Sequence, residues 1–122
     1  MQSPNFIILY VDNPGASAAF YQGLIRRAPV ESSPTFAMFA LDGGYMLGLW
    51  GKTGVQPPTE RTGGGSELGW PVANDGEVER LHAAWQVAGL PIAQAPTRMD
   101  FGYTFVALDP DGHRLRVFAP AG

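Results

Sequence analysis

The apolar and polar positions of the N-terminal half predict one helix and four strands. Residues 6–11 (FIILYV) form an unbroken apolar run, which predicts a strand. Asn13 and Pro14 follow at the cap and first-turn positions of a helix predicted over 15–25. The apolar positions of this helix are Ala16, Ala19, Phe20 and Leu24. Three strand-like runs complete this half, at 29–32, 35–41 and 45–50.

The C-terminal half repeats this order of elements. Residues 67–72 are strand-like, and Asn74 and Glu77 have the spacing of a capping box at the start of a helix. Gly89 and Pro91 end that helix. Its predicted buried stripe consists of Val78, Leu81, Trp85 and Ala88. Strand-like runs follow at 92–95, 103–108 and 115–119.

A constant spacing relates the two halves. Phe6 and Glu67, at the starts of the two first strands, are 61 residues apart, and so are the two cap asparagines. We interpret this pattern as a duplicated βαβββ unit within an α+β fold. The intervening segment is rich in Gly and Pro and has no apolar periodicity, as flexible linkers do. The predicted organisation is a single domain over 1–122, with modules at 5–50 and 66–119 joined by a crossover at 51–65.

Composition excludes several classes of protein. The chain has 122 residues with 8 Lys and Arg against 11 Asp and Glu, and the basic residues form no run that would suggest nucleic-acid binding. Its longest apolar run is far shorter than the roughly 20 residues of a membrane helix. Since there is no cysteine, disulfides, thiolate metal sites and cysteine nucleophiles are excluded, and a cytoplasmic location is expected.

Two motifs at the ends of the chain carry a family resemblance. The segments LYVDN at 9–13 with AFY at 19–21, and DPDGHRLRV at 109–117, resemble the signatures of the vicinal oxygen chelate superfamily. That superfamily includes glyoxalase I, extradiol dioxygenases, fosfomycin-resistance enzymes and bleomycin-binding proteins. The resemblance implies βαβββ modules that each form a half-barrel, a homodimer, and a cavity between modules.

Three further segments resemble one branch of that superfamily. LGLWG at 47–51, SELG at 66–69 and FGYTF at 101–105 are similar to the phenazine antibiotic resistance proteins. Members of that branch are taken to be metal-free binding proteins that sequester a planar tricyclic antibiotic. The resemblance therefore implies a small-molecule binder with no cofactor.

The four positions that hold metal ligands in the superfamily's enzymes test this implication. Carried over to this chain, they are Phe6, Gly48, Glu67 and Arg116. Only Glu67 has a ligating side chain, whereas a metal site needs three or four nitrogen or oxygen ligands. His82 and His113 are expected on a helix face or at the surface. We therefore expect no metal, no catalytic residue and no enzymatic activity.

Strand alternation predicts which residues share a face with these four positions. Aromatic and flexible apolar residues dominate the set, which suits a flat aromatic ligand. Tyr103 or Thr104 joins it, depending on the register of the strand at 103–108. Glu67 and Arg116 form a salt bridge, orient a ligand, or do both. The candidate ligand-binding residues are Phe6, Ile8, Tyr10, Met46, Gly48, Trp50, Glu67, Tyr103, Arg116 and Phe118.

The expected function is sequestration of a planar aromatic molecule, such as a phenazine-like antibiotic, with antibiotic resistance as the result. Two alternatives remain open at this point. One is a lyase, isomerase or dioxygenase of the same superfamily with an atypical metal site. The other is a bleomycin-type binding protein, against which Arg114 and Arg116 argue, because a cationic drug favours an acidic cleft.

Overall fold

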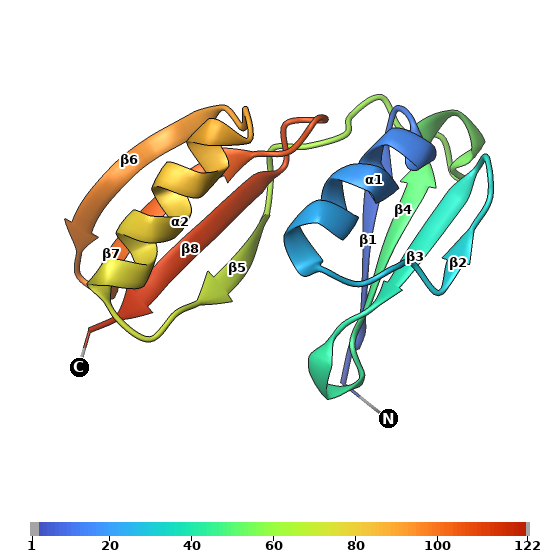
Figure 1. The fold of residues 1–122 in the computed structure, drawn as a ribbon. Coiled ribbons are helices and arrows are strands. Elements are labelled where there is room, and N and C mark those ends of the chain that lie inside the picture. Colours follow the sequence, from blue (N-terminus) through green and yellow to red (C-terminus); the bar gives the residue numbers. More distant parts are fainter. Residues whose placement is uncertain (1–2, 122) are drawn as a thin grey trace. The chain divides into compact units, whose positions relative to one another are not determined.

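The computed structural model describes residues 3–121, and the chain in it forms two compact units that divide between Gly63 and Gly64 (Figure 1). We refer to the part up to Gly63 as unit 1 and to the part from Gly64 as unit 2. Residues 1–2 and 122 of the predicted domain lie outside the described part. Each unit contains one α-helix and one four-stranded sheet.

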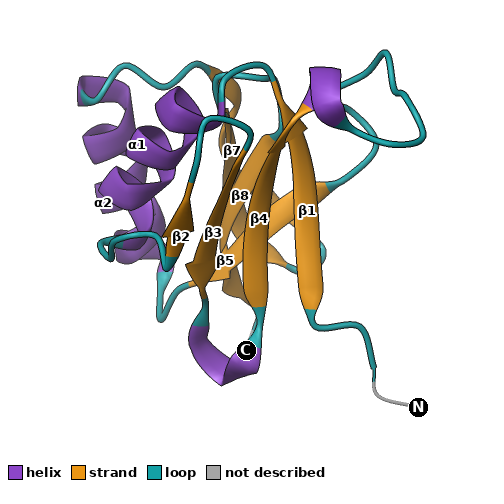
Figure 2. Cartoon of the chain, turned by 90° about the vertical axis from the view of Figure 1, so that its right-hand side faces the viewer, coloured by secondary structure: helices purple, strands orange, loops and turns teal. Residues whose placement is uncertain are grey.

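Unit 1 has the strand order β1-β4-β3-β2 (Figure 2). Strands β1 and β4 are parallel, whereas β4 pairs with β3, and β3 with β2, in antiparallel fashion. Short 3-10 turns follow β3 and β4, at Asp42–Gly44 and Lys52–Gly54. The elements are β1 (Phe6–Val11), α1 (Pro14–Ile25), β2 (Glu31–Ser32), β3 (Phe36–Ala40) and β4 (Met46–Gly51).

Unit 2 repeats this topology with the order β5-β8-β7-β6. Its first and fourth strands are again parallel, and the other neighbours are antiparallel. The elements are β5 (Glu67–Pro71), α2 (Asp75–Val87), β6 (Ile92–Met99), β7 (Gly102–Leu108) and β8 (Arg114–Pro120). The α+β fold of two βαβββ modules is therefore confirmed. Strand β6 runs four residues beyond its predicted end at 95, and β2 is shorter than predicted.

Both helices begin where the cap asparagines predict. The Asn13 side chain accepts a hydrogen bond from the Ala16 backbone N–H (3.1 Å), and that of Asn74 accepts one from the Glu77 N–H (3.0 Å). The Glu77 carboxylate binds Arg80 at 2.7 Å. In the part of the chain that the structure describes, no helix is long and apolar enough to cross a membrane.

The helix of each unit covers one face of its sheet. In unit 1, the strand residues on the α1 side are almost fully buried: Leu9, Val11, Ala37, Phe39, Leu47 and Leu49. In unit 2, Phe105 lies edge-on to Trp85 of α2, and Trp70 meets the same indole at 5.8 Å between ring centroids. Alternate strand residues therefore build the core, and those between them lie on the opposite face.

The predicted apolar face of α1 is wrong by about one residue. The buried positions are Pro14, Ser17, Ala18 and Tyr21, whereas Ala16 and Ala19 are exposed. The buried face includes Ser17 and Tyr21, so a pattern of purely apolar residues does not mark it. Helix α2 agrees better with its prediction, since Val78 and Trp85 are its buried residues.

Candidate functional site

Nine positions on β1, β4 and β3 make up most of the face of the unit 1 sheet that lies opposite α1. Strand register arranges them as three cross-strand rows over β1, β4 and β3. We call these nine positions the apolar face, because none of them carries a charged side chain; Glu31 of β2, which pairs with Met38, lies at their edge on the same side of the sheet. The rows are Tyr10, Trp50 and Phe36, then Ile8, Gly48 and Met38, then Phe6, Met46 and Ala40.

Much of the apolar face is open to solvent. Phe6 and Ile8 are 43% and 45% exposed, and most of the other side chains in the three rows are half-buried. One row is entirely aromatic, and within it the rings of Tyr10 and Trp50 meet edge to face with centroids 6.3 Å apart. A contiguous exposed apolar surface of this kind marks a binding site for a ligand or a partner more often than chance.

Strand register brings together the unit 1 residues that the sequence predicts for the site. Phe6, Ile8 and Tyr10 of β1 lie directly opposite Met46, Gly48 and Trp50 of β4. The prediction missed the contribution of β3. The signal was present in Asp42-Gly43-Gly44, since a turn there aligns β3 with β4 and adds Phe36, Met38 and Ala40 to the face.

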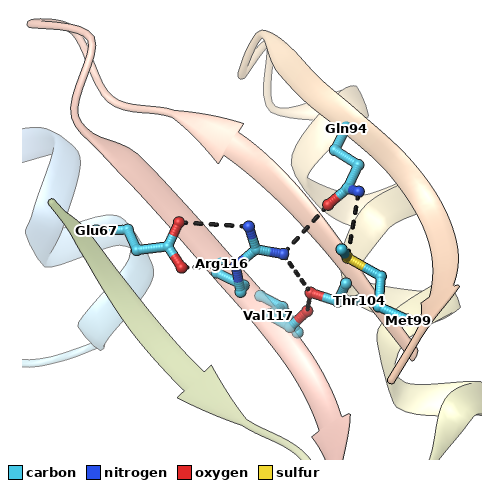
Figure 3. A network of polar contacts seen from close by, with 6 residues as sticks. All are labelled: Glu67, Gln94, Met99, Thr104, Arg116 and Val117. Carbon is cyan, nitrogen blue, oxygen red and sulfur yellow. Dashed lines mark hydrogen bonds and ion pairs between the residues drawn. The ribbon is translucent and has the colours of Figure 1, made fainter. Parts of the chain in front are cut away.

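On the corresponding face of unit 2, polar side chains converge on Arg116 (Figure 3). Its Nε donates to Glu67 Oε1 at 2.6 Å, and its Nη2 lies 3.4 Å from Glu67 Oε2. Nη1 donates to Gln94 Oε1 and to Thr104 Oγ1, each at 3.2 Å. We call these four residues the arginine cluster. Their side chains come from four different strands, so only the assembled sheet creates the cluster.

The partners of Arg116 are themselves oriented by further contacts. The Thr104 hydroxyl donates to the Val117 carbonyl at 2.8 Å, which leaves its oxygen to accept from Arg116. The Gln94 amide donates to the Met99 sulfur at 3.5 Å, so its carbonyl oxygen faces the guanidinium. Four of the five guanidinium N–H groups thus have protein partners, and Arg116 is held in one place.

Two phenylalanine rings border the cluster. The Phe101 ring centroid lies 5.6 Å from the guanidinium carbon of Arg116, within the range of cation–π attraction. Phe101 also meets Phe118 edge to face at 6.2 Å. The Arg116 side chain is only 17% exposed as a result, whereas that of Glu67 is 38% exposed.

The register of β7 decides between Tyr103 and Thr104. Thr104 pairs with Phe118 and binds Arg116, so it lies on the face of the arginine cluster. Tyr103 points to the other side, where its hydroxyl donates to Glu79 of α2 and its ring faces the Arg98 guanidinium at 5.0 Å. The structure therefore separates Tyr103 from the other candidate residues of unit 2.

The side chains at the four implied ligand positions do not fit a metal ion. Phe6 and Gly48 supply no donor atom, and the carboxylate of Glu67 is ion-paired with the cationic Arg116. Within residues 3–121, no group of three or more His, Cys, Asp or Glu side chains is placed to hold a metal. We therefore derive no chemical step through a metal.

The two histidines do not join either face. His113, which the sequence placed among exposed or helix-face residues, is buried, and its Nδ1 lies 2.8 Å from Asp109 Oδ2 in the turn before β8. The Asp109 carboxylate also accepts from the His113 backbone N–H at 2.8 Å. His82 lies on α2, with its ring 5.3 Å from that of Phe105. These contacts stabilise the turn and the core.

The family model of the glyoxalase/bleomycin resistance protein/dioxygenase superfamily matches residues 3–117, and the chain belongs to this superfamily. The chain is 29% identical to the phenazine antibiotic resistance protein EhpR of Enterobacter agglomerans over 118 residues, which are 94% of this chain and 90% of that protein.

Two solved structures have the same fold over the whole of this chain. One is a protein from Agrobacterium tumefaciens, determined by NMR in solution, with 53% identity, a TM-score of 0.93 and complete coverage of both chains. The other is a glyoxalase-related enzyme from Fulvimarina pelagi, with 26% identity, a TM-score of 0.84 and coverage of 100% of this chain and 94% of that one.

Proposed function

We propose that this protein binds and sequesters a planar aromatic small molecule of the phenazine type, without a metal and without catalysis, and thereby confers resistance to it. The apolar face of unit 1 carries the proposal. Its aromatic row and its uncharged neighbours suit a flat, apolar ring system, because offset stacking adds about 0.5–1.5 kcal/mol to the burial of apolar area.

The relative EhpR supports the same class of ligand, since its name describes resistance to phenazine antibiotics and the alignment spans most of both chains. Superfamily membership alone does not favour this role, because the superfamily includes glyoxalases and dioxygenases as well as bleomycin resistance proteins. The ring type of the ligand is therefore the part of the proposal that most needs a direct test.

In this proposal Trp50 is the principal stacking residue. Phe6, Ile8, Tyr10 and Met46 supply the apolar walls around it, with Gly48 between them. On unit 2, the arginine cluster offers a ligand polar groups of its own, and the hydrogen bonds within the cluster limit what it can offer. Because four N–H groups of Arg116 are already bonded, it has one donor left for a ligand, and Glu67 Oε2 makes only a long contact. Phe118, which meets Phe101 edge to face, is an apolar residue at the border of that cluster.

Calorimetric titration with phenazine-1-carboxylate tests the proposal. We expect micromolar or tighter binding, about tenfold weaker binding for Trp50→Ala, and near-native binding for Trp50→Phe, which keeps a ring. Trp85→Phe is the matched control, because Trp85 lies in the core of unit 2. Affinity weaker than millimolar, or an unchanged affinity for Trp50→Ala, contradicts the proposal.

Metal analysis separates binding from catalysis. Protein purified without chelators is expected to contain no stoichiometric Zn, Ni, Mn or Fe. A stoichiometric metal that is lost in Glu67→Gln would instead support a lyase, isomerase or dioxygenase. The same metal analysis tests whether this chain shares an enzymatic role with the glyoxalase-related enzyme of Fulvimarina pelagi, whose fold it shares.

The proposal also includes a homodimer in the cytoplasm, as the superfamily resemblance and the lack of cysteine suggest. Light scattering coupled to size-exclusion chromatography tests the assembly, and fractionation of the source cells tests the location. A monomer at high micromolar concentration would contradict the first part and leave the binding proposal standing.

A further inference from the structure

Gly48 occupies the centre of the apolar face. It lies between Ile8 of β1 and Met38 of β3 in the middle row. A Cβ atom at this position would stand 2.9 Å from Phe6 Cε1, 3.0 Å from Phe36 Cζ and 3.1 Å from Phe36 Cε1. Real Cβ atoms essentially never approach another heavy atom as closely as 2.9 Å. The two rings therefore occupy space that any side chain at position 48 would need.

The two rings reach Gly48 from opposite sides. Phe6 belongs to the row of Met46, and Phe36 belongs to the row of Trp50, so each ring leans across to the middle row. The absence of a side chain lets both rings lie low over the β4 backbone. Both rings therefore lie against the backbone of Gly48.

Unit 2 provides a natural comparison. Gly69 of β5 also lies in the middle row of its sheet, beside Arg116. A Cβ atom there would lie 3.4 Å from Phe118 Cε1, which is ordinary van der Waals contact. A methyl group at position 48 would therefore require both rings to move, whereas a methyl group is compatible with the space at Gly69.

We propose that Gly48 is the specificity-determining position of the apolar face, and that it restricts the ligand to flat fused-ring aromatics. This inference rests on the proposed function and names the feature that the site selects. The face selects a flat ligand, because a folded ring system contacts rings that lie close to the sheet with only part of its area.

The physical effect of a methyl group at position 48 is to lift both rings. A radial gap of 0.5–1 Å already removes about a quarter to a half of the dispersion attraction between two surfaces. We therefore expect Gly48→Ala to weaken the binding of a flat tricycle by about three- to tenfold. A folded tricycle gains less from the flat surface, so its affinity changes less.

Paired titrations with phenazine and phenothiazine test the inference. Both are uncharged three-ring compounds of similar outline, but phenazine is flat and phenothiazine is folded about its nitrogen–sulfur axis. Wild-type protein is expected to prefer phenazine, Gly48→Ala to lose most of that preference, and the matched variant Gly69→Ala to keep it. Thermal unfolding of all three proteins shows whether the fold is intact.

The outcomes separate the inference from the function on which it rests. If Gly48→Ala binds phenazine with native affinity and preference, the inference is wrong and the proposed function stands. If the wild-type protein binds neither compound, both are wrong. Should Gly48→Ala not fold, Phe36→Leu removes one of the two rings without adding an atom at position 48. An unchanged preference in that variant overturns the inference, and a reduced one supports it.

Discussion

The two units carry very different residues at equivalent positions of their two sheets. The third residue of the fourth strand is Gly48 in unit 1 and Arg116 in unit 2, and each lies between corresponding strands. Around Gly48 the surface is apolar and aromatic. Around Arg116 the surface is polar, and the guanidinium donates charge-assisted hydrogen bonds to Glu67, Gln94 and Thr104. The opposite faces are alike, since in both units they are apolar and covered by a helix.

This difference shows that the backbone topology and the helix-covered core define the module, and that the other face is free to change. A glycine at the centre lets two rings cover β4. An arginine at the centre requires a carboxylate and two oriented acceptors, because a half-buried guanidinium without partners is costly. The arginine cluster is therefore a stability element of unit 2, whatever it also does for a ligand.

The largest expected effect comes from removing the centre of the cluster. Arg116→Ala leaves Glu67 and Gln94 without their partner, and we expect the free energy of unfolding to fall by about 1–3 kcal/mol. Because the Glu67 side chain is 38% exposed, water screens part of its interaction with Arg116, and we expect a loss in the lower part of that range. Urea denaturation measures the change.

Arg114→Ala is the matched control, because Arg114 lies two residues earlier on the same strand and is exposed. We expect its unfolding free energy to stay within about 0.5 kcal/mol of the wild type. Equal losses in the two variants would mean that Arg116 is no more than a surface residue, and the contrast between the units would lose its energetic basis.

A smaller effect is expected at the ring that covers Arg116. Phe101→Leu keeps an apolar side chain but removes the aromatic face, and should lower the unfolding free energy by about 0.5–1 kcal/mol. A double-mutant cycle with Arg116→Met isolates the contact, since the loss should largely disappear once the cation is gone. Additive losses would show that Phe101 acts through packing alone, for instance against Phe118.

Tyr103 sharpens the distinction between the two sides of β7. Its hydrogen bond to the Glu79 carboxylate, with burial as a lesser cause, raises the pKa of Tyr103 above its ordinary value of 10.0. The folded state thus holds the phenolic proton more tightly than the unfolded chain. The resulting stabilisation is complete below pH 10 and is lost as the pH rises through the higher pKa of the folded protein.

Absorbance titration of tyrosinate measures this shift, and Tyr103→Phe should remove one late-titrating group. Because Tyr103 faces α2, the same variant should bind phenazine-1-carboxylate with native affinity. A substantial loss of affinity in Tyr103→Phe would place the phenol in the binding surface after all, against the register of β7.

The smallest effect is expected at the exposed pair on α2. The side-chain hydrogen bond to Arg80 lowers the pKa of Glu77 below its ordinary value of 4.5. The stabilisation is therefore present at neutral pH and is lost as the pH falls through the lowered pKa of the folded state. NMR titration of Glu77 should show the lower pKa in the wild type and its return toward 4.5 in Arg80→Ala.

Salt distinguishes this pair from the arginine cluster. Exposed ion pairs are strongly screened at 1 M salt, where the Debye length is about 3 Å, whereas the half-buried Arg116 is screened less. The effect of Arg80→Ala on stability should vanish at high salt, and that of Arg116→Ala should persist. If the effect of Arg116→Ala vanished at high salt and that of Arg80→Ala persisted, the half-buried position of Arg116 would be contradicted.

Predictions from the sequence succeeded where the physical cause is local. Each cap asparagine accepts a hydrogen bond from a backbone N–H three residues later, so a helix start is visible in a few adjacent residues. The apolar run at 6–11 forms β1, and the stripe of α2 buries Val78 and Trp85 as predicted. The same reasoning was weaker for α1, because a serine and a tyrosine occupy its buried face.

By itself, the sequence determined the order of strands and helices, the repeat of the βαβββ unit and the residues on β1 and β4 that share a face. These follow from hydrophobic period and cap chemistry, which act over a few residues. Only the tertiary structure decided that Thr104 and not Tyr103 meets Arg116, that Phe36 and Met38 extend the apolar face, and that two rings lie over Gly48. Those contacts depend on the pairing register between strands distant in sequence, and a shift of one residue would reverse every side chain.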